Sequence, residues 1–181
     1  MKITFRRWEQ TDAESVRVLL RETWLDAYGG FIPREDIFHY LEEHYSIEEV
    51  RLLMQDPDVA GFVAEVDGNI RGCEKTFYHR EEKRLYVHQL YIHPEFQGLG
   101  LGKQLMLFAA ERAKTMEQDR VWLGVMTENL PAISWYKKMG YQIVDQMPFT
   151  MGRTHVDHYI GYVTVQDIEA ANSRSPRRKH K

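Results

Sequence analysis

The chain has 181 residues, of which 43% are hydrophobic and 28% charged. That length and composition suit one folded α/β domain and exclude disorder over the whole chain. No apolar run approaches the ~20 residues that a membrane-spanning helix needs, so we expect no membrane protein. No secretory signal is visible at the start of the chain, and a single cysteine, Cys73, excludes a disulfide framework and a cysteine-rich zinc site. We therefore expect a cytoplasmic protein.

The net charge of −3 conceals a basic segment at the end of the chain. The last ten residues hold five of the 24 Lys and Arg residues and no acid, which leaves 19 basic against 27 acidic residues before them. Such a tail can bind nucleic acid or anionic lipid. It has no apolar residue to dock it, so we interpret it as solvated and expect no nucleic-acid or membrane partner. The expected organisation is one domain over residues 1–166 and a polar, basic tail over 167–181.

Hydrophobic periodicity predicts a strand, three helices and three strands in the first half of the chain. Two Ser/Thr-x-x-Glu capping boxes, Thr11 with Glu14 and Ser46 with Glu49, predict where two of the helices begin. The sequence Asp67-Gly68-Asn69 predicts a hairpin turn between two β-rich runs. The helices are expected over about 11–28, 33–45 and 46–54, and the strands over 2–8, within 59–79 on either side of that turn, and over 85–92.

The second half of the chain predicts two helices and three strands. A helix is expected from about Leu101 to Met116, and another is opened by Asn129 and Pro131 and closed by Gly140. The strands are expected over 121–126, 141–146 and 156–165, with a loop over 147–155 between the last two. This order predicts a mixed α/β sheet with helices on its faces.

The chemistry is concentrated in residues 90–104, where a predicted strand stops at His93-Pro94 and a glycine-rich turn leads into a helix. Glycines at positions 98, 100 and 102 allow the backbone to turn tightly and to approach a ligand closely. The helix that follows begins with unpaired amides and the positive end of its dipole. This arrangement is typical of a phosphate-binding site.

Three phosphate-binding patterns compete for this turn. A Walker loop requires Ser or Thr after Gly-Lys, but Lys103 is followed by Gln104, and the glycine spacing does not match a dinucleotide-binding fingerprint. The third pattern, Gln/Arg-x-x-Gly-x-Gly/Ala, is matched in full by Gln97, Gly100 and Gly102. At this point the chain resembles the GCN5-related N-acetyltransferase (GNAT) superfamily, in which this loop binds the pyrophosphate of coenzyme A.

A second segment resembles the same family. It reads N-x-P-A-x-x-W-Y-x-x-x-G-Y from Asn129 to Tyr141, and the resemblance extends over roughly residues 2–165. It implies a mixed, mostly antiparallel central sheet flanked by helices and splayed at its two central parallel strands. It also implies direct acetyl transfer from acetyl-CoA to an amine in a ternary complex.

The resemblance assigns cofactor contacts residue by residue. The pantetheine arm would pair with the strand at Leu90, Tyr91 and Ile92, and Asn129 would bind the same arm besides capping its helix. The family motif places Tyr136 as the acid that protonates the departing thiolate and as a cofactor contact. The pyrophosphate would lie on the amides of Gln97, Gly98, Leu99, Gly100, Leu101, Gly102 and Lys103.

The general base is less well defined by the sequence. Many family members have a Glu in the strand over 85–92, where this chain has His88 and Gln89. His88 is one candidate, since imidazole titrates near neutral pH, although a strand His is more often a satisfied polar residue. Glu74 on the preceding strand is the second candidate. We interpret Cys73 as a buried strand residue, and His155 with His158 as weak signs of a metal site, so no metal is expected.

The early helical segment resembles a branch of bacterial small-amine acetyltransferases. Trp24, Tyr28 and Phe31 would form an aromatic wall for a cationic acceptor such as a polyamine, although aromatic residues at helical spacing are more often core. A peptide N-terminus or a protein lysine is the alternative acceptor, and a non-catalytic acyl-CoA-binding regulator is the alternative function. The resemblance also allows a homodimer. The acids that would attract a cation, or else form a solvated face, are Glu35, Asp36, Glu42 and Glu43.

Overall fold

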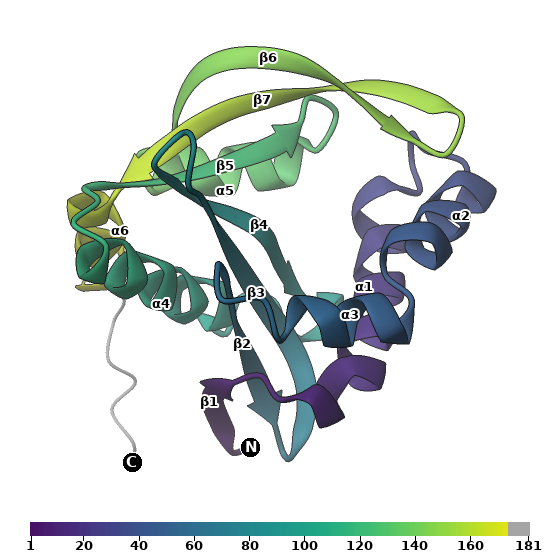
Figure 1. The fold of residues 1–181 in the computed structure, drawn as a ribbon, viewed down its shortest axis with the longest axis horizontal. Helices are drawn as coiled ribbons and strands as arrows, with labels where there is room; N and C mark the ends of the chain where they lie inside the picture. The colour runs from purple at the N-terminus through teal and green to yellow at the C-terminus, as the bar shows by residue number, and fades with distance from the viewer. Residues whose placement is uncertain (174–181) are drawn as a thin grey trace.

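Seven strands form one sheet in the order β1-β2-β3-β4-β5-β7-β6 in the computed structural model, which describes residues 1–173 (Figure 1). Strands β4 and β5 are parallel, and every other neighbouring pair is antiparallel. The expected mixed, mostly antiparallel sheet with a parallel central pair is therefore confirmed. The strands are β1 (Ile3–Arg7), β2 (Val59–Val66), β3 (Asn69–His79), β4 (Arg84–Ile92), β5 (Arg120–Met126), β6 (Gln142–Met151) and β7 (Thr154–Thr164).

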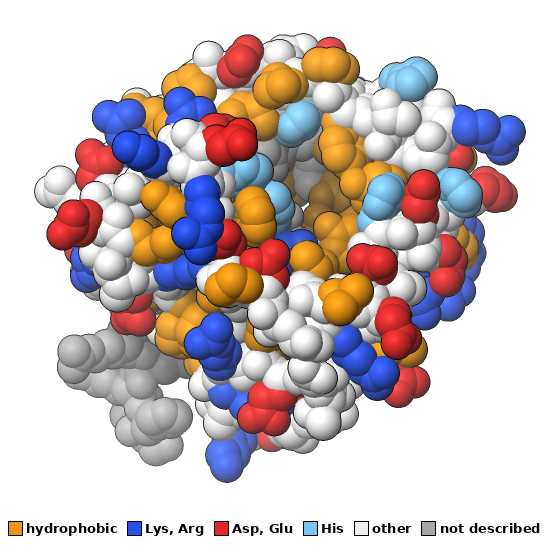
Figure 2. Space-filling view, viewed as in Figure 1, with side chains coloured by type: hydrophobic (Ala, Val, Ile, Leu, Met, Phe, Trp, Pro, Cys, Tyr) orange, Lys and Arg blue, Asp and Glu red, His pale blue; other side chains and the backbone are white. Residues whose placement is uncertain are grey.

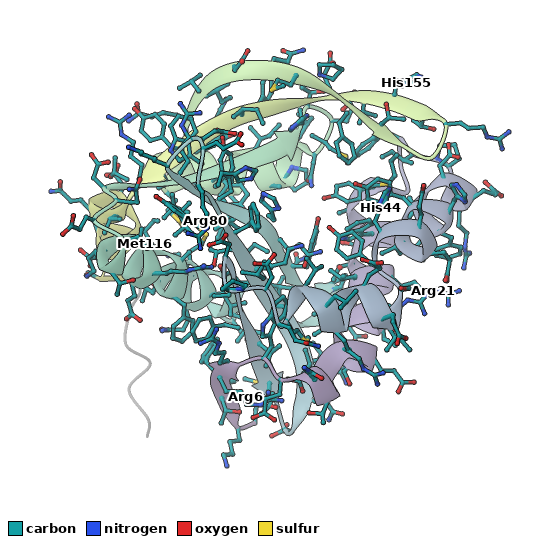
Figure 3. All side chains as sticks on the ribbon, in the orientation of Figure 1. Arg6, Arg21, His44, Arg80, Met116 and His155 are labelled. Carbon is teal, nitrogen blue, oxygen red and sulfur yellow. The ribbon has the colours of Figure 1, made fainter. Side chains whose placement is uncertain are left out.

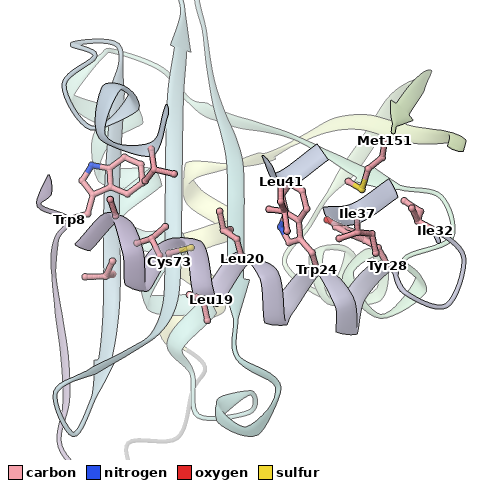
Figure 4. Close-up of a cluster of buried hydrophobic side chains, with 14 of the residues drawn as sticks. Trp8, Leu19, Leu20, Trp24, Tyr28, Ile32, Ile37, Leu41, Cys73 and Met151 are labelled. Atoms are coloured by element: carbon pink, nitrogen blue, oxygen red, sulfur yellow. The ribbon is translucent and has the colours of Figure 1, made fainter. Parts of the chain in front are cut away.

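Helices cover both faces of the sheet. One cluster of buried side chains joins α1, α2 and α3 to β2 and β3, and Trp24, Ile37 and Leu41 lie near its centre (Figure 4). A second cluster joins α4, α5 and α6 to β4, β5 and β7. We call these two sides the α1 face and the α4 face of the sheet. The helices are α1 (Ala13–Tyr28), α2 (Arg34–His44), α3 (Ile47–Leu53), α4 (Leu101–Thr115), α5 (Leu130–Lys138) and α6 (Val165–Ser173), with short 3-10 turns η1 (Gln10–Asp12) and η2 (Pro94–Phe96).

The two central strands separate after a short stretch of pairing. Parallel pairing between β4 and β5 is limited to Tyr86 with Trp122 and Val87 with Leu123. The next residue of β4, His88, is a bulge, because Val87 and Gln89 occupy consecutive partner positions on β3. A bulge bends its strand and leaves the extra residue unpaired. From His88 to Ile92, β4 therefore presents an unpaired edge toward β5.

Two local expectations differ from the structure. The first capping box is formed by Glu9 and Asp12 instead of Thr11 and Glu14, because the 3-10 turn η1 precedes α1. The expected loop over 147–155 is mostly strand, since β6 and β7 form a long hairpin that turns at Gly152 with a φ of 61°.

Helix α6 was not predicted from the sequence. It packs against α4 through the buried side chain of Ile168, and the expected domain boundary after residue 166 falls inside it. Most of the basic tail lies outside the described residues. Within residues 1–173, none of the helices is both long enough and apolar enough to cross a bilayer.

Candidate active site

The glycine-rich turn before α4 has the geometry of an anion site. Gly98 and Gly100 have φ values of 76° and 85°, which glycine adopts without strain. The first amide to bond inside the helix is that of Gln104, to the Gly100 carbonyl at 3.1 Å, so the amides of Leu101 and Gly102 have no partner within the helix. A Cβ added at Gly98 or Gly100 would meet no atom within 4 Å, so the space beside the turn is open.

The residues around this turn secure it to the rest of the fold. The Gln97 side-chain amide donates to the Ile92 carbonyl at 3.3 Å, which joins the turn to the end of β4. The Lys103 ammonium donates to the Ala171 carbonyl at 3.2 Å, so this side chain extends toward α6. The backbone of the turn is thus left as the anion-binding element.

The unpaired edge of β4 continues from this turn toward the bulge at His88. Its backbone groups at Leu90, Tyr91 and Ile92 have no partner on β5. On the far side of the gap, Asn129 caps α5 by accepting from the Ala132 amide at 3.2 Å, which confirms its expected capping role. Amides at a helix N-terminus for a pyrophosphate and a free strand edge for an extended amide-bearing arm are what coenzyme A requires, so these residues fit it.

Tyr136 extends from α5 into the same region. Its ring packs between those of Trp135 and Tyr141, at centroid distances of 4.9 and 5.9 Å. Burial raises the pKa of the phenol, and the nearby Tyr28, Tyr141 and Glu74 raise it further. The hydroxyl forms no hydrogen bond with any residue in the described part of the chain. Tyr136 is therefore protonated and able to donate to a bound group.

The strand register places the two candidate bases on opposite faces of the sheet. Directly paired residues of neighbouring strands point to the same side. Glu74 pairs with Leu90, which packs against residues of α4, so Glu74 lies on the α4 face. The Glu74 side chain is 1% exposed and neither carboxyl oxygen has a hydrogen-bond partner. Burial raises its pKa well above the usual value, against the smaller opposing effect of Arg112, so burial disfavours the charged form of this carboxyl.

His88 lies on the α1 face, in a group of aromatic rings. Its ring is 5.4 Å from that of Phe77, and its Nε2 is 3.3 Å from Nε2 of His79. Desolvation by these neighbours lowers the pKa of His88 to about 4, and the positive charges of Lys75 and His79 add to this effect. His88 is therefore neutral near pH 7 and has a ring nitrogen that can accept a proton.

Aromatic side chains form one wall of the α1 face. Trp24, which is 3% exposed, packs against the rings of Tyr28, Tyr40, Tyr45 and Tyr91 at centroid distances of 5.4 to 5.9 Å. The structure thus brings Trp24 and Tyr28 together as expected, with Phe31 6.0 Å from Tyr28. Figure 2 shows a hollow in the middle of this side of the molecule, with hydrophobic and His side chains on its walls.

Several residues around the hollow were not singled out in the sequence. Tyr40 and Tyr45 lie within the expected helical segment, and their aromatic character was the available signal. Phe149 reaches the wall from the β6–β7 hairpin, 5.7 Å from Tyr40, and its segment was expected to be a loop. Lys75 lies in the buried stretch of β3 beside Glu74, and its long charged side chain was a visible signal that we did not use.

Three of the four acids expected to attract a cation have partners within the protein. The Asp36 carboxylate accepts from the Thr154 hydroxyl at 2.6 Å, which ties α2 to the β6–β7 hairpin. Glu42 forms an ion pair with Arg17, and Glu43 lies 3.5 Å from the His44 ring nitrogen. Figure 3 labels one residue on each side of the contact between α2 and the β6–β7 hairpin, His44 on α2 and His155 on the hairpin.

The remaining candidates have structural surroundings. Cys73 is 1% exposed, and burial raises the pKa of its thiol to about 12, in agreement with its interpretation as a buried strand residue. His155 Nδ1 is 2.8 Å from the Thr150 hydroxyl, and His158 Nδ1 is 2.9 Å from the Met147 carbonyl. Among residues 1–173, no three His, Cys, Asp or Glu side chains are grouped so that they could hold a metal ion.

A phosphate-binding turn beside two parallel strands that separate is the architecture of an acyl-CoA-dependent acyltransferase. The chain belongs to the Acetyltransferase (GNAT) family, whose sequence model matches residues 17–141. It is an enzyme of that family.

Individual relatives agree with this assignment. The chain is 27% identical over 149 residues to the spermidine N(1)-acetyltransferase of Thermoplasma acidophilum, covering 80% of this chain and 91% of the relative. It is 32% identical over 126 residues to an uncharacterized N-acetyltransferase of Methanocaldococcus jannaschii, covering 67% of this chain and 54% of that longer relative. The crystal structure of PaiA N-acetyltransferase from Thermoplasma acidophilum in complex with coenzyme A has the same fold. Its TM-score is 0.79 at 23% identity, over 91% of this chain and 99% of that one.

Proposed function

We propose that the protein transfers the acetyl group of acetyl-CoA directly to the primary amine of a small molecule in a ternary complex. One observation carries this proposal, the gap between β4 and β5 that opens at His88. The glycine turn and Tyr136 lie on one side of this gap, and the aromatic hollow of the α1 face lies on the other. A thioester and an amine can therefore enter from different sides and meet at the bulge. Holding two reactants in this way supplies much of a rate enhancement.

Three groups of the chain would assist the transfer. When bound, acetyl-CoA supplies an activated acetyl thioester. A backbone amide on the unpaired edge of β4 donates to the carbonyl oxygen as negative charge develops on it. The amine nitrogen bonds to the carbonyl carbon and gives its proton to His88, while the carbon–sulfur bond breaks. The phenol of Tyr136 protonates the departing sulfur, which requires that it be protonated beforehand, as its raised pKa ensures.

Glu74 has no place in this scheme. It is buried on the α4 face, on the opposite side of the sheet from the aromatic hollow through which the amine would enter. His88 is on the α1 face and is unprotonated near pH 7. Because its pKa is only about 4, it is a weak base and acts on an amine that arrives in its neutral form.

A polyamine is the first acceptor to test. The named activity of the Thermoplasma relative and the aromatic wall, whose ring faces attract cations, both support it. Of the acids that were expected to attract a cation, Asp36 and Glu42 are paired with other residues, so they give this expectation no support.

The test is the release of free thiol from acetyl-CoA by the purified protein with spermidine, aminoglycosides, amino acids and short peptides. Mass spectrometry of the product would locate the acetyl group. Turnover that depends on one class of amine supports the proposal. Thiol release that is independent of every amine, with coenzyme A still binding, would contradict it.

A further inference from the structure

The floor of the hollow on the α1 face is built from hydrogen-bond donors. Lys75 and Gln89 are a directly paired couple on β3 and β4, so their side chains lie next to each other on this face. Both are nearly fully buried, at 4% and 3% exposure. The Lys75 ammonium lies 5.1 Å from the centre of the Tyr45 ring, whose other neighbour is the Trp24 indole at 5.4 Å.

None of these donors has a conventional acceptor. Nε2 of Gln89 and Nε1 of Trp24 are buried and lack a hydrogen-bond partner. The Lys75 ammonium forms no hydrogen bond or ion pair with residues 1–173, and its polar contact is the face of the Tyr45 ring. Buried polar groups in folded proteins are nearly always paired, so the two buried, unpaired donors Gln89 and Trp24 on the same face as the Lys75 ammonium indicate a missing acceptor.

The charges on this face agree with that reading. The side chains of β3 and β4 that share it with Lys75 are Cys73, Phe77, His79, Tyr86, His88, Gln89 and Tyr91, and none of them is an acid. An ammonium group placed at Lys75 would meet a like charge and no acceptor. A carboxylate placed there would accept from the Lys75 ammonium and from the amide of its strand partner Gln89, and charge-assisted bonds of this kind are strong.

We propose that the amine acceptor carries a carboxylate, that Lys75 binds this carboxylate, and that Gln89 and Trp24 are its further donors. This inference rests on the proposed acetyl transfer and narrows its substrate class from small amines to amino acids. His88 follows directly before Gln89 on β4, so the reacting amine and the carboxylate are a few bonds apart. The aromatic wall then receives the side chain of the amino acid.

Matched pairs of acceptors test the proposal, each pair consisting of an amino acid and its decarboxylated amine. Suitable pairs are phenylalanine with 2-phenylethylamine, 4-aminobutyrate with propylamine, and lysine with 1,5-diaminopentane, with spermidine as a separate acceptor. We expect kcat/KM to be about tenfold or more higher for the amino acid in at least one pair. Equal or better turnover of the amine in every pair, or spermidine as the best acceptor, would overturn the proposal.

Substitution of Lys75 shows whether this side chain causes the preference for the amino acid over its decarboxylated amine. Lys75→Met keeps the length of the side chain and removes the charge, and should abolish the preference for the amino acid over its amine by raising KM for the amino acid about tenfold or more. Lys83→Met is the matched control, because Lys83 is exposed in the turn between β3 and β4. If both variants keep the wild-type preference, Lys75 does not bind the carboxylate.

A binding measurement separates this inference from the proposed function. 3-Phenylpropanoate and butanoate carry the carboxylate but no amine, so they cannot be acetylated. Calorimetric or NMR binding of either one to wild type and to Lys83→Met, but not to Lys75→Met, supports the carboxylate site even if no amine is turned over. If neither binds to wild type, or either binds equally well to Lys75→Met, the inference fails whatever the enzyme acetylates.

Discussion

The hydroxyl groups of Tyr28 and Tyr91 lie 2.9 Å apart, which joins the last turn of α1 to β4 beside the unpaired edge of that strand. Burial raises the pKa of both phenols, so both are protonated and one donates to the other. The bond connects the aromatic wall of the hollow to the strand that would hold the cofactor.

Removing either hydroxyl should destabilise the fold, because either change removes the same hydrogen bond. We expect Tyr28→Phe and Tyr91→Phe each to lower the free energy of unfolding by about 1 kcal/mol, and the double variant to lose less than the sum. Urea unfolding of the four proteins measures this coupling. Strictly additive losses would show that the two hydroxyls do not interact.

Tyr136→Phe should reduce kcat by about 10² or more, because the thiolate would leave without its proton donor. The affinity for coenzyme A should change little, since the ring and its packing against Trp135 are retained. Thiol release and calorimetry measure the two quantities. Tyr162→Phe is the control, since this hydroxyl bonds Gln142 on the edge of the sheet. A kcat within twofold of wild type would remove Tyr136 from the mechanism.

Gly100→Ala should weaken coenzyme A binding by about tenfold, because a left-handed conformation is strained by about 1–2 kcal/mol in a residue with a Cβ. Gly68→Ala is a matched control: its φ of 82° imposes similar strain in the β2–β3 turn. Thermal unfolding should show a similar loss of stability in both variants. Calorimetry should show weaker cofactor binding in Gly100→Ala alone, and equal affinities would contradict the role of this turn.

His88→Gln should lower kcat by about 10² with saturating amine, since the amide cannot take a proton. Because the pKa of His88 is about 4, wild-type kcat should show no inflection from this residue between pH 6 and 8. His155→Gln, on the hairpin, is the control. A kcat that is unchanged in His88→Gln would assign the proton transfer to solvent.

Lys75→Met should stabilise the protein near neutral pH. Burial lowers the pKa of Lys75 from 10.5 to about 8, so the folded state disfavours the charge that the unfolded chain carries freely. The penalty is fully present below pH 8 and is relieved as the pH rises toward 10.5. We expect the variant to be about 2–3 kcal/mol more stable than wild type at pH 7, with a smaller difference at pH 10.

Urea unfolding at the two pH values measures this difference. The titratable groups that face Lys75 are Cys73 and Tyr45, whose pKa values are about 12, and His88, with a pKa of about 4, so none of them titrates in this window. His79 is the remaining neighbour, and it is present in both proteins. An equal difference at pH 7 and pH 10 would mean that Lys75 has the same pKa in the folded and unfolded states, so that burial does not lower it.

Local sequence signals predicted the parts of the fold that depend on neighbouring residues. The Ser46 and Asn129 caps and the turn at Asp67-Gly68 are set by backbone chemistry within a few positions, and each lies where it was expected. The glycine turn was found for the same reason, since its spacing alone distinguishes it from other phosphate-binding loops.

Features that depend on distant residues were not predictable in this way. Residues 147–155, between two expected strands, were expected to be a loop, and pairing between β6 and β7 is what extends the strands into this stretch. The face on which Glu74 lies follows from its register with Leu90, and periodicity along β3 does not reveal that register. The same register places Lys75 beside Gln89 on the α1 face.

The bond from Asp36 to Thr154 spans 118 positions along the chain. Phe149 is therefore added to the wall of the hollow only when the β6–β7 hairpin packs against α2, and a contact between such distant residues forms late in folding. During synthesis the glycine turn and β4 emerge before the hairpin exists, so the parts that would hold the cofactor precede the completed acceptor wall. A nascent chain should accordingly gain affinity for coenzyme A before it can distinguish one amine from another.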